Sequence, residues 1–202
     1  MAATVLYMSM SVDGFIAGPN ERVDNGLGDG GERLHEWVFQ GDAADGPSSV
    51  EVRGDVNQQV VDEFMSTGAV VAGRGTFEPA GGWGGDHHDG VPIFIVTRQE
   101  PGTLPQWPLV TYVDDVTTAM TRARAAAGDK DVLVHGAGVA QLALAAGALD
   151  ELELHVIPVL LGQGRRLFDG LPAEHIELVR TRTLEGEGGV THLHYRVERD
   201  VL

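Results

Sequence analysis

The stretch that most constrains the fold is Asp131–Gly147, in which an apolar run leads into a glycine turn and then into a helix-forming segment. Val132–Val134 has the aliphatic and β-branched composition of a buried strand. Val139–Ala146 has the composition of a helix, and Gly147 ends it. The stretch therefore predicts one strand–turn–helix unit of an α/β protein.

The turn in this unit, His135-Gly136-Ala137-Gly138, predicts a site for an anion. Its two glycines let the backbone turn sharply and let a ligand approach without meeting a Cβ atom. The helix start at Gly138–Ala140 offers unpaired N–H groups and the positive end of the helix dipole, which favour phosphate. A tight turn without a ligand fits the same residues. The strict Rossmann fingerprint is absent, because Gln141 stands where it needs a third small residue.

Length and composition predict a single globular domain over residues 1–202. Hydrophobic residues make up 43% of the chain, and no apolar run approaches the ~20 residues that a membrane span needs. We see no signal peptide, and the absence of cysteine excludes disulfides and thiolate zinc sites. These features lead us to expect a cytoplasmic protein.

The formal charge of −16 limits the partners of the chain. A surface with 30 acidic and 14 basic residues repels nucleic acid and anionic membranes, so we expect neither as a partner. An anionic ligand would have to find positive charge somewhere, which makes the position of each arginine informative.

Three further apolar runs also end in polar or glycine-rich turns. Thr4–Met10 leads to Asp13, a carboxylate placed either to bond its own turn or to face a ligand at the edge of the sheet. Ala69–Ala72 leads to the Gly73-Arg74-Gly75-Thr76 turn, and Pro92–Val96 leads to Thr97-Arg98. A fourth run, Leu109–Val113, reads as another buried strand.

The carboxyl ends of parallel strands meet at one edge of a sheet, so we expect these turns to converge there. The turns after Ala72, Val96 and Val134 then form a site for a dinucleotide. An arginine beside it suggests a ribose phosphate, and hence NADP, although each arginine also fits a solvated position on the rim.

The remaining elements are read from apolar spacing and capping residues. We expect helices over Val56–Thr67, with Asp55 as its cap and Met65 among its inward residues, and over Val116–Ala127. A short helical piece, Glu32–Phe39, interrupts a long acidic loop. The segments His175–Leu184 and Val190–Val197 predict an antiparallel hairpin, and Pro158 predicts a bulge or an edge at the end of the strand before it.

The histidines do not predict a metal site. Adjacent histidines such as His87 and His88 usually point apart, and no further ligand stands at a convincing spacing. His192 and His194 lie two apart on the last expected strand, near His155, and such a pair can chelate. We expect them instead to face solvent.

Taken together, the motifs resemble those of the dihydrofolate-reductase-like superfamily, in the branch of the riboflavin-biosynthesis reductase, the C-terminal domain of a bifunctional deaminase–reductase. The resemblance rests on an ordered set of segments that covers nearly the whole chain: Ser11–Pro19, Gly73–Glu78, His135–Gly138 and Pro158–Phe168. It implies a three-layer α/β/α fold with a mixed, mostly parallel sheet and a C-terminal antiparallel hairpin. It also implies NADPH as the hydride donor and commonly a homodimer.

The resemblance assigns roles to particular residues. It places a first group at the nicotinamide: Ile16, Ala17 and Gly18. It places a second group at the adenosine phosphates and a third at the pyrophosphate: Gly73, Arg74, Thr76, Thr97 and Arg98, then Gly136, Ala137, Gly138, Val139 and Ala140. A fourth group would face the substrate: Met10, Asp13, Trp37, Leu160, Leu161 and Gly162.

These assignments lead to a hypothesis about the reaction. We expect hydride transfer from NADPH to a C=N or C=O carbon of a small heterocycle, either a ribosylamino-pyrimidine or a pterin-like substrate, with Asp13 fixing the substrate or relaying a proton. Arg165 and Arg166 are candidates for a substrate phosphate, or are simply solvated. Deaminase activity is not expected, because its zinc site needs cysteines. The alternative is a protein that binds NADP(H) without turnover, such as a sensor.

Overall fold

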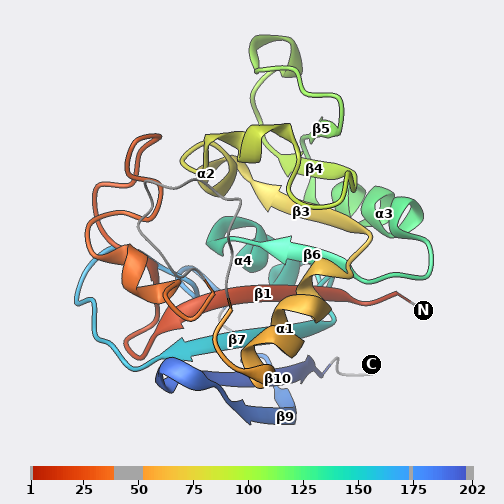
Figure 1. Cartoon of the computed structure of the whole chain (residues 1–202). Coiled ribbons are helices and arrows are strands. Elements are labelled where there is room, and N and C mark those ends of the chain that lie inside the picture. The colour runs from red at the N-terminus through yellow and green to blue at the C-terminus, as the bar shows by residue number, and fades with distance from the viewer. Residues whose placement is uncertain (1, 39–51, 173–174, 199–202) are drawn as a thin grey trace.

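The computed structural model describes residues 2–38, 52–172 and 175–198, and its centre is an eight-stranded sheet in the order β5-β4-β3-β6-β1-β7-β10-β9 (Figure 1). The six strands from β5 to β7 run parallel, and β10 and β9 add an antiparallel hairpin. The strands of this sheet are β1 Thr4–Ser11, β3 Ala69–Gly73, β4 Ile93–Val96, β5 Val110–Val113, β6 Val132–His135, β7 Glu151–Ile157, β9 Leu178–Glu185 and β10 Thr191–Val197. A small second sheet pairs β2 Phe15–Ala17 with β8 Arg165–Arg166.

Helices cover both faces of the large sheet, and their bounds are α1 Asp55–Met65, α2 Arg74–Phe77, α3 Val116–Ala127 and α4 Ala137–Ala145. Short 3-10 turns are η1 Gly31–Leu34, η3 Gly81–Gly85, η4 Pro101–Thr103 and η5 Glu187–Gly189. The apolar residues of α3 and α4 pack on one face of the sheet, and α1 and η1 lie on the other (Figure 1). This three-layer α/β/α arrangement confirms the predicted fold class.

Strand β1 lies at the centre because it is apolar on both faces. Leu6 and Met8 join the core under α3 and α4, whereas Val5 and Tyr7 join the core on the α1 side. Period-two alternation sends neighbouring side chains to opposite faces, so one strand supplies both cores.

The C-terminal hairpin confirms the predicted antiparallel pairing. Strand β10 pairs with β7 on one side and with β9 on the other, and the η5 turn joins the hairpin strands. Strand β7 ends at Ile157, because Pro158 has no N–H to give to the ladder.

Three local expectations were wrong. Gly54, not Asp55, is the N-cap of α1, and no side chain caps that end. Met65 is exposed, because the inward stripe of α1 runs through Asn57 and Val60. The helical piece expected over Glu32–Phe39, of which Phe39 lies outside the described residues, is a 3-10 turn at Gly31–Leu34, which buries Leu34.

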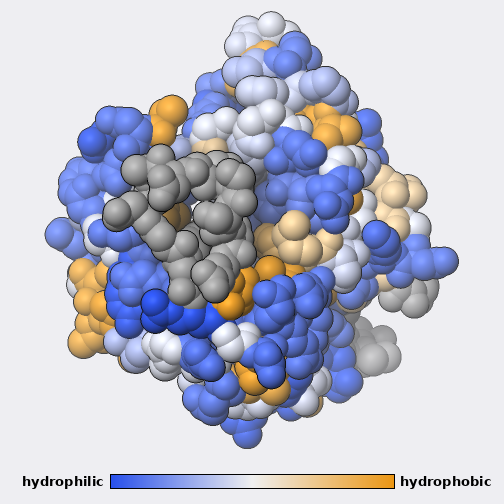
Figure 2. Space-filling view, in the orientation of Figure 1, coloured by the Kyte–Doolittle hydropathy of each residue, from blue (hydrophilic) through white to orange (hydrophobic). Residues whose placement is uncertain are grey.

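The face that carries α1 is mainly hydrophilic in Figure 2, with small separate hydrophobic patches among the described residues. None of the helices in the described ranges is long and apolar enough to span a bilayer.

Candidate functional site

The carboxyl ends of the parallel strands form one edge of the sheet, and the predicted turns follow directly from it. Strand β6 pairs with β1 on one side and with β3 on the other, and β4 pairs with β3. The turns after β3, β4 and β6 therefore start from adjacent strands at the same edge. This arrangement brings together the segments that the sequence predicts to converge.

Two of the turns touch at Gly136 and Thr76. Gly136 has φ 100° and ψ 155°, a conformation open almost only to glycine. A Cβ atom on Gly136 would lie 2.0 Å from Oγ1 of Thr76, so a side chain at position 136 would displace the α2 turn. The absence of a side chain is what lets the β3–α2 and β6–α4 turns close on each other.

The first turn of α4 is available to an anion. Ala137, Val139 and Ala140 are buried beneath it, whereas Gly138 is exposed and a Cβ there would meet nothing within 4 Å. The N–H groups of a first helical turn have no intrahelical acceptor, and α4 has no side-chain cap. Such a terminus, open to solvent and with its donors free of a cap, fits a phosphate group.

The cationic side chains at this edge differ in their partners. Arg74 makes a two-point ion pair with Glu78, with Nε–Oε1 2.7 Å and Nη2–Oε2 2.9 Å. Thr97 is buried, and its hydroxyl accepts from the N–H of Gln99, while Arg98 is exposed. Arg98 is therefore accessible to a ligand as it stands, whereas Arg74 would have to share or leave Glu78.

Asp13 ties the end of β1 to the loop after β7. Its Oδ1 accepts from the Ser11 hydroxyl at 2.6 Å and from the N–H of Leu161 at 3.1 Å, and its Oδ2 accepts from the N–H of Gly162 at 2.7 Å. The Ser11 hydrogen bond, with the two from the backbone, lowers the pKa of Asp13. The carboxylate stays ionised at neutral pH, which favours a positioning role over proton relay.

Both arginines of β8 hold parts of this edge together. Arg166 lies over the ring of Phe15, with Cζ 4.5 Å from the centroid, and donates to the backbone oxygen of Asp13. Arg165 donates to the Gly75 oxygen at 2.9 Å and pairs with Glu21 at 2.7 Å. Ser11 and Glu21 are not among the predicted site residues. Glu21 reaches Arg165 only in the folded chain, whereas Ser11 lies two residues from Asp13, at a spacing visible in the sequence.

The residues predicted for the nicotinamide and the substrate occupy different surroundings. Ile16, Ala17 and Gly18 are buried, and a Cβ on Gly18 would meet the Asp29 oxygen at 2.0 Å. Met10 is half-buried against the α4 core, Leu161 is half-buried, and Leu160 and Gly162 are exposed. Their roles in binding stay predictions.

Trp37 packs into the core on the α1 side. Its Nε1 donates to the Ser9 hydroxyl at 2.9 Å, and its ring lies 4.6 Å from the ring of His155 and 4.9 Å from that of His192. Trp37 is 6% exposed, so in this conformation it belongs to the buried core and presents little surface to a ligand.

The expectation that His192 faces solvent was wrong. His192 is fully buried, and its Nδ1 lies 2.9 Å from Nδ1 of His155, which is also buried. Burial lowers the pKa of His192 to about 4, and it also lowers that of His135, at the end of β6, to about 4. These histidines are neutral at physiological pH.

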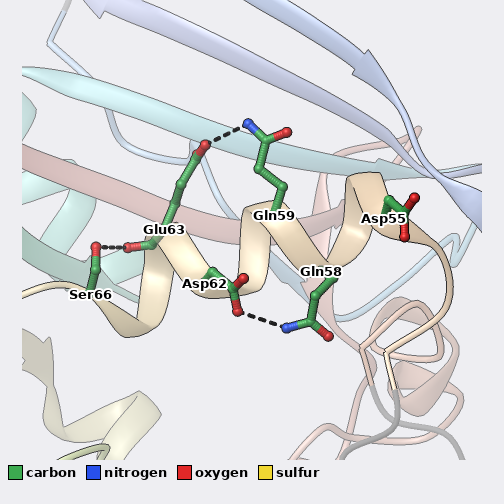
Figure 3. A pocket seen from close by; sticks show the side chains of 6 residues that line it. All are labelled: Asp55, Gln58, Gln59, Asp62, Glu63 and Ser66. Atoms are coloured by element: carbon green, nitrogen blue, oxygen red, sulfur yellow. Dashed lines mark hydrogen bonds between the residues drawn. The ribbon is translucent and has the colours of Figure 1, made fainter.

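A shallow hollow of about 460 Å³ lies elsewhere, along the outer side of α1 (Figure 3). Its lining is Asp55, Gln58, Gln59, Asp62, Glu63 and Ser66. The glutamines bond the carboxylates one turn away, as the dashed lines in Figure 3 show. Among the described residues, three carboxylates and no cation line this hollow, so it does not suit an anionic ligand.

The family model of the RibD C-terminal domain matches residues 3–188 of the chain. No curated protein matches this chain. Three of the solved structures that share the fold illustrate the similarity. A protein from Shewanella sp. PV-4 attributed to riboflavin biosynthesis is similar with TM-score 0.69 and 21% identity, over 98% of this chain and 99% of that one.

The second is a Thermotoga maritima diaminohydroxyphosphoribosylaminopyrimidine deaminase/5-amino-6-(5-phosphoribosylamino)uracil reductase. It is similar with TM-score 0.60 and 15% identity, over 98% of this chain and 57% of that one. The third is the dihydrofolate reductase of Enterococcus faecalis, complexed with NADP(H) and RAB-propyl, with TM-score 0.58 and 15% identity over 98% and 97%. Identities this low show a common fold and nothing finer.

Proposed function

Because this chain belongs to the RibD C-terminal domain family, we propose that it is a reductase that transfers a hydride from NADPH to a C=N or C=O carbon of a small heterocycle. Ribosylamino-pyrimidines are the substrate class we favour, since the similar Thermotoga protein is named a 5-amino-6-(5-phosphoribosylamino)uracil reductase. The chain spans 57% of that protein, so this substrate is proposed for the reductase part alone.

The observation that carries the proposal is the contact of two glycine turns at the carboxyl edge of a parallel sheet. Gly136 fits against Thr76, which leaves the uncapped first turn of α4 open beside the β3–α2 turn. In open α/β sheets, ligands bind outside the carboxyl ends of the strands. A ligand here would meet backbone donors and the positive end of a helix, which suits a pyrophosphate.

NADPH would supply the hydride when bound, and the protein would supply binding, orientation and exclusion of water. The N–H groups at Ala137–Val139 would hold the pyrophosphate, and Arg98, together with Arg74, would hold the adenosine phosphates. The segment Ile16–Gly18 would border the nicotinamide. Gly18 is fixed there by the hydrogen bond from its N–H to the Leu27 oxygen at 2.9 Å.

Asp13 would act by holding the substrate loop in place. Its carboxylate accepts from the N–H groups of Leu161 and Gly162, and so fixes the loop that begins at Pro158 against the end of β1. Arg166, anchored over Phe15, brings positive charge to the same corner and suits the phosphate of a ribosylamino substrate. Orientation of this kind lowers the barrier to hydride transfer by pre-arranging the reacting atoms.

The test separates binding from turnover. Fluorescence titration would measure the NADPH dissociation constant of the wild type and of Arg98→Ala, with Arg196→Ala as the control. Arg196 lies beside Glu151, at the opposite end of β7. We expect Arg98→Ala to weaken NADPH binding about tenfold, the loss of one charge-assisted contact of roughly 1.4 kcal/mol, and Arg196→Ala to leave it unchanged.

NADPH oxidation would then be followed against ribosylamino-pyrimidine, pterin and simple carbonyl substrates. Oxidation with the first class supports the proposal. Tight NADPH binding without oxidation of any substrate would instead make the chain a non-catalytic NADP(H)-binding protein. Absence of NADPH binding would refute both.

We also propose that the protein is a homodimer in the cytoplasm. Light scattering coupled to size-exclusion chromatography measures the mass directly. A monomer at micromolar concentration would contradict the dimer.

A further inference from the structure

Three potential metal ligands meet inside the protein, on the face of the sheet that α1 covers. Glu153 and His155 lie two apart on β7, and His192 pairs directly with His155 across β10. One ligand atom from each lies within 4.8 Å of the other two. The residues are 1%, 4% and 0% exposed, so this is an interior cluster and not an acidic patch on the surface.

The hydrogen bonds around His192 turn one of its lone pairs toward the other ligands. The amide nitrogen of Asn57 donates to the backbone oxygen of Glu187 at 3.1 Å, so the amide oxygen of Asn57 faces His192. Nε2 of His192 donates to that oxygen at 3.0 Å, which leaves Nδ1 as the acceptor, 2.9 Å from Nδ1 of His155. A ligating histidine is commonly oriented in this way, by an acceptor on its other ring nitrogen.

Glu153 adds a carboxylate that the protein satisfies only in part. Its Oε2 accepts from Arg182 at 3.2 Å, whereas its Oε1 is buried and has no hydrogen-bond partner among the described residues. Arg182 is also held by Glu63, through contacts of 2.7 and 2.6 Å. Two carboxylates therefore share one guanidinium. A buried carboxylate oxygen without a partner is costly, and a cation would relieve that cost.

We propose that Glu153, His155 and His192 bind a divalent transition-metal ion, with Zn²⁺ as the best fit. Two imidazoles and one carboxylate are a ligand set for zinc and its neighbours in the first transition row, and not for Mg²⁺ or Ca²⁺, which prefer oxygen ligands. The ion would bridge β7 to β10, and Asn57 would orient His192 from outside the ligand set. The proposal concerns residues other than the glycine turns of the proposed nucleotide site.

The two histidine nitrogens need little adjustment to accept the ion. With zinc–nitrogen bonds of about 2.0–2.1 Å, the two nitrogens of a tetrahedral site lie roughly 3.3 Å apart. The observed 2.9 Å would have to open by roughly 0.4 Å. His155 would carry its proton on Nε2 in place of Nδ1, a change of tautomer that alters no charge. A fourth position would be left for water.

The chain contains a second histidine pair that serves as a control. Nδ1 of His87 lies 2.8 Å from Nδ1 of His88, much like the proposed pair. His88 instead uses its Nε2 on Thr67, and neither histidine belongs to a group of three potential ligands in the described part of the chain. A metal that needed only two adjacent histidines would bind the His87–His88 pair as well as the His155–His192 pair.

The experiment measures Zn²⁺ bound per chain after metal loading and desalting, and the affinity by competition with a chelator. We expect one equivalent in the wild type. Glu153→Gln should lower the affinity at least about tenfold and His192→Asn should abolish stoichiometric binding, whereas His87→Gln should change neither. Circular dichroism and thermal unfolding without metal check that each variant folds. No bound zinc in the folded wild type, or equal binding by all four proteins, would overturn the proposal.

A second measurement uses the wild type alone, in case the core variants do not fold. A crystal of the full chain soaked with Zn²⁺ is examined at the zinc absorption edge. The proposal requires an anomalous peak between β7 and β10, within coordination distance of His155 and His192. Peaks confined to surface histidines such as His175 would refute it.

Discussion

Replacing Gly136 by alanine tests how the two glycine turns are held together. The residue stands at φ 100° and ψ 155°, and its missing Cβ is the space that Thr76 occupies. Alanine would meet two separate penalties, one from its own backbone and one from the contact between β6–α4 and β3–α2.

The size of each penalty follows from the geometry. A non-glycine residue in this backbone region costs about 1–3 kcal/mol. A Cβ 2.0 Å from Oγ1 of Thr76 also forces that side chain or its turn to move, at about 1–3 kcal/mol for overpacking of this kind. We expect the free energy of unfolding to fall by about 2–6 kcal/mol. For a chain of this length, at roughly 2–4 °C per kcal/mol, that is a fall in Tm of roughly 4–24 °C.

Urea denaturation gives the free energy directly, and two further variants identify its source. Gly138→Ala is the matched control, because a Cβ at position 138 meets nothing within 4 Å and alanine favours a helix. It should leave stability unchanged or raise it by up to about 1 kcal/mol, and yet weaken NADPH binding if the proposed pyrophosphate lies there. Combining Gly136→Ala with Thr76→Ala should recover at least about 1 kcal/mol of the loss relative to additivity. A Gly136→Ala protein within about 0.5 kcal/mol of the wild type would refute the reasoning.

Two other predictions concern ion pairs. Glu78 holds Arg74 in an ion pair, so Glu78→Gln should free Arg74 and strengthen the binding of NADPH relative to that of NADH. Arg74→Ala should weaken NADPH binding about tenfold. If titrations show equal effects on NADPH and NADH, Arg74 does not contact the ribose phosphate. Burial raises the pKa of Asp150, but hydrogen bonds from Thr4 and Arg124 outweigh it and leave the pKa below its usual value. A lowered carboxyl pKa contributes stability above the unfolded value of about 3.9, and that contribution is lost as the pH falls through the folded value. Asp150→Asn should therefore lower the free energy of unfolding by about 1 kcal/mol at pH 7 and by progressively less below about pH 4. Urea denaturation at each pH measures this free energy. A difference between variant and wild type that stays constant with pH would show that the charge of Asp150 is not responsible.

Much of the architecture could be predicted because it depends on local sequence. The apolar runs before Gly73, Thr97 and Gly136 are short, β-branched and bounded by glycine or polar residues, so their strands were predicted within a residue or two. Helix α3 was predicted at its exact bounds, since Asp115 caps it through the N–H of Thr118 and Gly128 ends it. The convergence of the turns followed from the parallel direction of the strands.

Other features of the site depend on contacts between distant segments. Asp13 could be singled out by its turn, but its partners Leu161 and Gly162 are almost 150 residues away. The two-point ion pair of Arg74 with Glu78 is local by contrast, because the two residues are four apart and lie on one side of the α2 turn. Sequence spacing shows that such groups exist and leaves open whether they bond each other or a ligand.

By itself, the sequence determined the order of strands and helices and the glycine turns at the strand ends, because capping, periodicity and backbone freedom act within a few residues. Only the tertiary structure decided the surroundings of the histidines. His155 and His192 are 37 positions apart, and both alternate with apolar residues such as Leu154 and Leu193, a pattern that suits histidines on the solvent-facing side of a strand equally well. The register of β10 on β7, and the cover supplied by Trp37 and Asn57, place both in the interior beside Glu153. Register and cover are set by packing between distant segments, which no local pattern encodes.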